Sequence, residues 1–278
     1  MNTISIDDII KRTQSLPALS SVVSELLDSI DREETDTDSI ARKIMQDQVL
    51  TAKTLRLANS SFYGMQHKIS SIQEAISVLG LRNIRTLVTA TAITGSFQSQ
   101  QIRAFDFKEF WQHSIATAAC ARQLARHVKA NTDQAFTAGL LHDIGKLALA
   151  AIFPDEYIQV VAYQTTHHCE ACQAEQQIFG SDHAFVGKIL TGRWNFPADM
   201  QSAIAFNHTE IDANTPLLSA IVQIADLFSR QLDRNDADVL PILPDAAIDR
   251  LQLSEEHCRA ILAQAREQFH DISQVLLA

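Results

Sequence analysis

Apolar side chains recur every three or four residues along almost the whole chain. One such stripe spans residues 19–30, and comparable stripes follow in residues 72–79, 106–128 and 216–232. This period is that of an α-helix with one buried face. Helix-breaking residues are scarce, since the 278 residues include only 8 Gly and 6 Pro, and no persuasive β alternation occurs. The sequence therefore predicts an all-α protein.

A short polar segment at residues 98–101 is the best candidate for a boundary between two parts of the chain. It is too short to let the two parts move as separate bodies. We therefore expect two packed helical lobes, the first over residues 1–100 and the second over residues 101–235. A loop and a last helix over residues 236–278 should pack on the lobes.

Charge and composition exclude several classes of protein. The formal net charge of −10 argues against a broad nucleic-acid surface, because neutralising phosphates needs clustered Lys and Arg. No apolar run reaches the ~20 residues of a membrane span, and Asp7 and Asp8 lie where a secretory signal would be basic. The four Cys are too few and too scattered for a disulfide framework. We expect a cytoplasmic bacterial protein without nucleic-acid or membrane partners.

His142 and Asp143 are adjacent in the apolar segment 138–150. Neighbouring residues on a helix diverge by ~100°, so both can bind one metal ion only if the ion lies off the helix edge. Gly145 removes a side chain beside the pair and allows a close approach. Lys146 lies on the same face, where it can contact a phosphate as a catalytic residue or simply pair with Asp143. Taken alone, the dipeptide favours a buried His–Asp hydrogen bond that only fixes helix packing.

Four further His and Asp residues fall on predicted helices after residue 100, namely His113, His183, His208 and Asp226. Asp226 stands in an apolar run, where a carboxylate is costly to bury unless it is paired or bound to metal. We therefore expect one inward-facing cluster with six members: His113, His142, Asp143, His183, His208 and Asp226. Imidazole and carboxylate ligands without thiolate suit iron, manganese or zinc. Two such ions about 3.5–4 Å apart could activate a hydroxide and clamp a phosphodiester.

Four of these residues, His113, His142, Asp143 and Asp226, resemble the H…HD…D signature of the HD superfamily of metal-dependent phosphohydrolases. The chain is most similar to the HDOD domain, a bacterial signalling relative of the HD-GYP phosphodiesterases. The similarity runs from about Leu16 to Leu232. Besides the signature it rests on the segments 16–19, 49–64, 71–80, 140–146 and 182–194.

The resemblance implies an all-helical fold in which the C-terminal lobe is HD-like. It also implies a regulatory or output role in bacterial signal transduction, with signalling proteins as partners and often without demonstrated catalysis. One or two divalent ions, or none, would occupy the site. Two departures matter: Asn207 stands where the HD-GYP enzymes have the first His of a pair, and no Gly-Tyr-Pro follows His208. The cyclic-dinucleotide pocket of those enzymes is therefore in doubt.

Three functions stay open. The chain can be a scaffold that binds signalling proteins through residues 16–97, with a degenerate or regulatory metal site. It can be an active metal-dependent phosphohydrolase on a nucleotide or cyclic dinucleotide. It can also be a sensor in which metal or nucleotide binding alters the lobe interface without turnover. The departures favour the first and third functions, and the retained His and Asp residues support the second.

Two other features have simpler explanations. The run from His167 to Cys172 contains two His and a Cys-x-x-Cys, which are the parts of a zinc site. No second Cys pair exists to complete a tetrahedron, so a helix start with two cysteines on one face is favoured. Phe62 and Tyr63 lie in a predicted turn, where they can anchor a partner or, as we favour, pack between the lobes.

Overall fold

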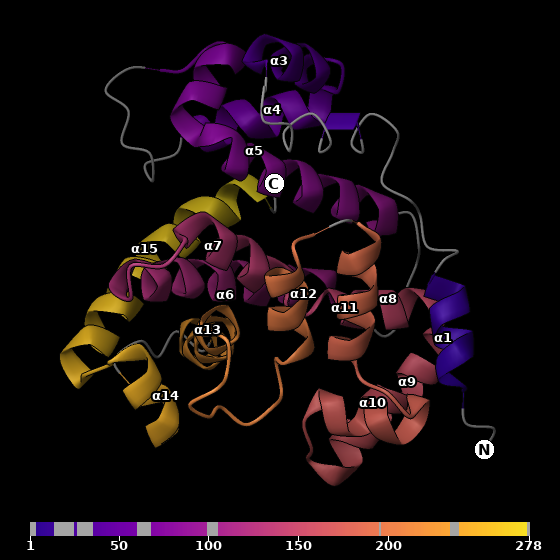
Figure 1. Ribbon diagram of the computed structural model, residues 1–278. Coiled ribbons are helices and arrows are strands. Elements are labelled where there is room, and N and C mark those ends of the chain that lie inside the picture. Colours follow the sequence, from indigo (N-terminus) through magenta and orange to yellow (C-terminus); the bar gives the residue numbers. More distant parts are fainter. Residues whose placement is uncertain are drawn as a thin grey trace. The chain divides into compact units, whose positions relative to one another are not determined.

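The structure is a computed structural model that describes residues 4–13, 25–26, 36–59, 68–98, 105–194, 196–233 and 239–276 (Figure 1). All regular structure in these ranges is helical, which confirms the predicted all-α fold. The turn at 16–19, most of the stripe at 19–30, Phe62 with Tyr63, and the linker after Gln98 lie outside the described residues.

The chain divides into two compact units. The first contains residues 1–16 and 101–266, and the second contains residues 17–100 and 267–278. The N-terminal helix therefore groups with the helices after residue 100, although the sequence placed it in a lobe of residues 1–100. The predicted packing of two lobes on each other stays a prediction.

The second unit is built from α3 (Thr37–Met45), α4 (Gln48–Ala58) and α5 (Ile72–Gln98), and α5 packs against both of the others. The side chain of Asp47 caps α4 by accepting a hydrogen bond from the backbone N–H of Leu50. Gly80 interrupts α5 with φ of 75° and ψ of 153°, a conformation that residues other than glycine rarely adopt. The break follows directly after the apolar stripe predicted over residues 72–79.

The first unit holds the other helices. Their bounds are α1 Ile6–Thr13, α6 Phe107–His127, α7 Thr132–Leu141, α8 Ile144–Ile152, α9 Pro154–His167, α10 Ala171–Phe179, α11 His183–Arg193, α12 Ala198–Ala205, α13 Leu217–Asp233, α14 Asp245–Leu251 and α15 Glu255–Leu276, whose last part belongs to the second unit. α6 packs against α7 and α13 (Figure 1). A Cβ on Gly139 of α7 would lie 2.9 Å from the Cα of Ala118. The alanine-rich face of α6 and this glycine therefore let the two backbones approach closely.

The helix α1 is fixed to the first unit through its last turn. The guanidinium of Arg193 on α11 donates a hydrogen bond of 2.7 Å to the backbone carbonyl of Thr13. The guanidinium of Arg12 lies 4.9 Å from the ring centre of Phe153, which is a cation–π distance. These contacts explain why α1 groups with the later helices.

One stretch, Thr132–Ile152, is long and apolar enough to cross a membrane, and 83% of its most apolar window is buried in the structure. It spans α7 and α8, which are separated by His142 and Asp143. A buried and interrupted stretch of this kind is a core element, and the cytoplasmic location stays a prediction.

The helices α8 and α11 meet through two glycines. A Cβ on Gly145 would lie 1.9 Å from the backbone oxygen of His183 and 2.8 Å from the backbone nitrogen of Gly187. Neither backbone atom can move without displacing its helix. A Cβ on Gly187 would instead meet Cγ2 of the Ile204 side chain at 2.8 Å, which is a side-chain contact and a longer one.

We expect Gly145→Ala to lower the free energy of unfolding by about 3 kcal/mol through overpacking. Gly187→Ala should change it by about 1 kcal/mol or less, because the gain in helix propensity offsets the milder clash. Urea unfolding of both full-length variants, followed by circular dichroism, measures the difference. Equal stabilities would show that the backbone contact at Gly145 is not tight.

Candidate metal centre

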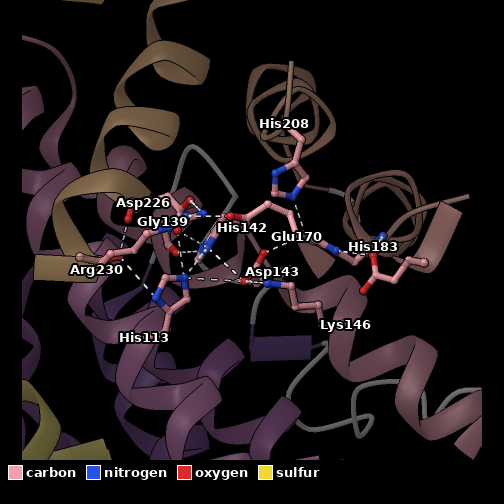
Figure 2. A network of polar contacts seen from close by, with 12 residues as sticks. His113, Gly139, His142, Asp143, Lys146, Glu170, His183, His208, Asp226 and Arg230 are labelled. Carbon is pink, nitrogen blue, oxygen red and sulfur yellow. Dashed lines mark hydrogen bonds and ion pairs between the residues drawn. The ribbon is translucent and has the colours of Figure 1, made fainter. Parts of the chain in front are cut away.

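The predicted pair His142–Asp143 lies at a break between two helices. His142 follows the last residue of α7, and Asp143 precedes the first residue of α8 with φ of −102° and ψ of 10°. The break removes the fixed divergence of neighbouring helical residues. Both side chains can therefore take part in the same network of polar contacts, as the sequence required (Figure 2).

The other four predicted residues come from different helices. His113 lies within α6, Asp226 lies within α13, and His183 is the first residue of α11. His208 was predicted at the end of a helix over 198–207, but α12 ends at Ala205 and His208 lies in the turn that follows. The structure brings all six side chains together in two groups.

The first group contains His113, His142 and Asp226. The Nε2 atoms of the two imidazoles are 3.2 Å apart. Oδ1 of Asp226 is 3.0 Å from Nε2 of His113 and 3.7 Å from Nε2 of His142. Two nitrogens and one carboxylate oxygen thus face a common point.

The second group contains Asp143, His183 and His208. Nε2 of His183 is 3.1 Å from Oδ1 of Asp143 and 2.6 Å from Nε2 of His208. The other oxygen of Asp143, Oδ2, is 3.4 Å from Nε2 of His142 in the first group. Asp143 therefore presents one oxygen to each group.

Contacts behind the first group fix the orientation of its rings. Nδ1–H of His142 donates to the backbone carbonyl of Gly139 at 2.7 Å. The Ser229 hydroxyl donates to the backbone carbonyl of Asp226 at 2.8 Å, and its oxygen lies 3.4 Å from Nδ1 of His113. Both imidazoles are thus held with Nε2 toward the group, which is how outer hydrogen bonds orient metal ligands.

Two cations lie beside the carboxylates. Nζ of Lys146 is 2.5 Å from Oδ2 of Asp143. Arg230 is 3.2 Å from Oδ2 of Asp226 and 3.4 Å from the exposed Glu170. The structure thus contains the salt bridge between Lys146 and Asp143, which was one of the two predicted roles of Lys146. The other role, contact of Lys146 with a phosphate, stays a prediction.

The charges of the site reinforce one another against the cost of burial. Burial favours neutral Asp143, but His142, Lys146 and His183 hold its pKa well below the usual range. Burial likewise favours the neutral form of Asp226, but the hydrogen bond with His113 lowers the pKa of this carboxyl group. Burial also favours neutral Lys146, whereas the charge of Asp143 raises the pKa of that ammonium. The carboxylates are therefore ready to accept a cation.

Sequence reasoning did not identify Glu175 on α10, which contacts the second group. It is fully buried, at 0% exposure, and its Oε2 atom is 2.5 Å from Nδ1 of His183. Glu175 follows the buried Ala174 and lies four residues before the buried Phe179. That position on the buried face of a helix was the available signal.

A cavity of about 350 Å³ opens onto both groups. Phe105, Phe110, Tyr157 and Val161 supply apolar parts of its lining. The ring of Phe105 lies 5.2 Å from that of Phe110 and 5.9 Å from that of Tyr157, measured between centroids. Burial raises the pKa of Tyr157, and the charge of Glu175 adds to this, so the phenol stays neutral. The cavity thus combines aromatic surface with the His and Asp groups.

The residues present fit a divalent metal ion. Oδ1 of Asp143 is buried and makes no hydrogen bond among the described residues, although Nε2 of His183 lies near it. The same nitrogen lies 2.6 Å from Nε2 of His208, so a carboxylate oxygen and two imidazole nitrogens meet at this point. Imidazole and carboxylate donors match iron, manganese or zinc.

Two other predicted features lie outside these groups. In the part of the chain that the structure describes, neither Cys169 nor Cys172 belongs to a group of metal-ligand type. His168 ends α9 in the left-handed conformation with φ of 51°, and Cys172 lies in the first turn of α10, as the helix-start interpretation predicted. Asn207 is buried and has no side-chain hydrogen bond to a described residue.

A family model of the HDOD domain matches residues 16–210. This chain belongs to the HDOD family. The matched range ends before Asp226, so the place of that residue in the site comes from the structure. The resemblance stated on the motifs is confirmed.

Solved structures of similar proteins include members with this fold. A proposed phosphohydrolase of Shewanella amazonensis is 25% identical, with a TM-score of 0.78 over 96% of this chain and 97% of its own. An HDOD domain protein of unknown function from Geobacter sulfurreducens is 25% identical, with a TM-score of 0.67 over 98% and 94%. The MmoQ response regulator of Methylococcus capsulatus is 25% identical, with a TM-score of 0.53 over 89% and 97%.

A curated relative, an uncharacterized protein of Treponema pallidum, is 28% identical over 233 residues. The match covers 81% of this chain but only 44% of that protein. The HDOD chain thus spans less than half the length of this relative.

We expect single substitutions to separate the two groups of the HDOD site. His142→Ala should abolish binding of one Mn²⁺ ion and His208→Ala the other, because each removes one of three ligands from its group. Asp143→Ala should abolish both, because its carboxylate faces both groups. Metal content after dialysis and Mn²⁺ titration by calorimetry measure this, with circular dichroism as the folding control. Retention of both ions by Asp143→Ala would contradict the shared carboxylate.

The stability of the metal-free HDOD protein should fall as the pH rises from about 6.5 to about 9. Burial lowers the pKa of His183, but the Glu175 carboxylate outweighs it and raises this pKa from 6.5 to about 9. Between these two values the folded protein therefore holds a proton that the unfolded chain releases. The resulting stabilisation is fully present below pH 6.5 and is lost as the pH rises through about 9. Urea unfolding across this range should show the slope in wild type and in the exposed control His167→Gln. A slope that persists in His183→Gln would assign it to another group.

Proposed function

We propose that this HDOD protein is a bacterial signal-transduction module that acts mainly by binding partners and ligands, with a regulatory HD-type metal site. The observation that carries the proposal is Asn207, a buried amide beside His208 whose side-chain nitrogen and oxygen make no hydrogen bond to a described residue. A two-metal hydrolase needs its full ligand set, since a misplacement of ~1 Å can cost 10²-fold in rate. The amide of Asn207 is a poorer ligand than imidazole for a transition metal.

The position of His208 supports the same proposal. It is exposed, and it lies in the turn after α12 rather than on a helix. Of the three members of the second group, His208 is thus the one that lies on a turn. An ion bound there would be held less firmly than catalysis requires.

The signalling part of the proposal is supported by the family and by its relatives. The response regulator named above has the same fold at 25% identity. Both groups of metal-ligand type among the described residues lie in the first unit. The second unit therefore needs another role, and a surface for signalling proteins supplies one.

The first unit would hold one or two divalent ions of iron, manganese or zinc through the six His and Asp side chains. Such an ion supplies Lewis acidity and a site for an anionic ligand. Lys146 and Arg230 are already paired with the carboxylates Asp143 and Asp226. A phosphate that enters the cavity would have to compete for them. A nucleotide is a ligand of suitable chemistry.

A second candidate function is metal-dependent hydrolysis of a nucleotide or cyclic dinucleotide. The convergence of six ligand-type side chains beside a cavity favours it. The relative from Shewanella amazonensis, named as a proposed phosphohydrolase, has the same fold. In this function Lys146 would leave Asp143 to contact the phosphate of the substrate.

Turnover assays separate the two candidates. We expect little or no hydrolysis of cyclic di-GMP, of nucleoside phosphates or of bis(p-nitrophenyl) phosphate by protein loaded with iron, manganese or zinc. We also expect the double variant His142→Ala, Asp143→Ala to retain partner binding or the cellular phenotype, provided that it remains folded. Robust turnover that disappears in this variant would favour the hydrolase.

A further inference from the structure

The carboxylate of Glu175 holds His183 at two points. Its Oε2 atom accepts the backbone N–H of His183 at 2.8 Å and lies 2.5 Å from Nδ1 of the same residue. Both hydrogen bonds therefore end on one oxygen. Because the ring is tied at Nδ1, its Nε2 faces Asp143 at 3.1 Å and His208 at 2.6 Å.

We infer that Glu175 is a positioning residue of the second group: it fixes the ring of His183 with Nε2 available to a divalent cation. This inference rests on the proposed metal site. Glu175 would not touch the ion, since its contact is with the far side of the imidazole. Outer carboxylates of this kind orient the ring and make the imidazole a stronger ligand.

Capping of α11 does not rest on Glu175 alone. The start of α11 already has its cap, because the Asp182 side chain accepts the backbone N–H of Phe185 at 3.0 Å. Glu175 is fully buried, and its Oε1 has no hydrogen-bond partner among the described residues. A buried carboxylate with an unpaired oxygen costs stability. Its negative charge beside the imidazole gives a reason to keep it.

The two groups differ in the acceptor behind each ring. In the first group His142 is tied to the neutral carbonyl of Gly139, and His113 lies beside the neutral hydroxyl of Ser229. In the second group His183 is tied to a carboxylate. The charged acceptor stands behind the group that contains the exposed His208. The added basicity of His183 compensates for that weaker set.

Three variants test the role of Glu175. Glu175→Met removes both hydrogen bonds with little change in volume. Glu175→Gln keeps an oxygen for both bonds and removes the charge. Glu156→Gln, on the neighbouring α9 and outside both groups, controls for the loss of a carboxylate. Mn²⁺ titration of the full chain should show a 10–100-fold weaker second group in Glu175→Met, a smaller loss in Glu175→Gln, and no loss in Glu156→Gln.

The first group provides the internal control. In a His208→Ala background, which leaves the first group intact, Glu175→Met should not change the affinity of the remaining ion. An equal loss at both groups, together with lower stability, would mean that Glu175 only supports the fold, and would overturn the inference.

A second readout does not depend on metal. In the metal-free protein the strongly hydrogen-bonded Nδ1–H of His183 should give a low-field proton resonance coupled to its labelled ¹⁵N. This resonance should be present in wild type and Glu175→Gln and lost in Glu175→Met. Its persistence in Glu175→Met would overturn the inference. Absence of metal binding by wild type, with the resonance still dependent on Glu175, would reject the proposed metal site while supporting the positioning of the ring.

Discussion

The site depends on the close approach of α8 to α11 at Gly145. The Cβ that any other residue would carry there lies 1.9 Å from the backbone oxygen of His183, so only glycine allows this packing. The same approach brings Asp143, two residues earlier, to 3.1 Å from the ring of His183. One backbone contact therefore joins the second group to the pair His142–Asp143. Without it Asp143 would face the first group alone.

Burial of so much charge is possible because nearly every charged group of the site has a partner of opposite sign. Asp143 pairs with Lys146, Asp226 with Arg230, and Glu175 with His183. Two of these carboxylates nevertheless keep an oxygen that accepts no hydrogen bond from a described residue: Oδ1 of Asp143 and Oε1 of Glu175. A buried network that is only partly satisfied is costly. Such a cost is expected at a site shaped for a ligand rather than for stability.

Much of the fold and the inner part of the site could be predicted from the sequence. The helices could be predicted because apolar side chains recur every three or four residues on the buried face. The break in α5 lies at Gly80, where a glycine can adopt a backbone conformation that other residues rarely take. Asp226 was found because a carboxylate in an apolar run needs a partner. The outer contacts could not be predicted in this way. Glu175 and Ser229 gain their roles only when their helices pack against His183 and His113, and nothing in local sequence fixes that packing.

The members of the two groups differ in how firmly the surrounding structure holds them. The first group takes its members from α6, α13 and the end of α7, which pack directly against one another in the core. The second group has one member on the turn after α12, beside Asn207. A ligand on a turn is held by fewer contacts than one on a packed helix. The second group is therefore the less firmly held of the two, and we expect the carboxylate behind His183 to matter most there.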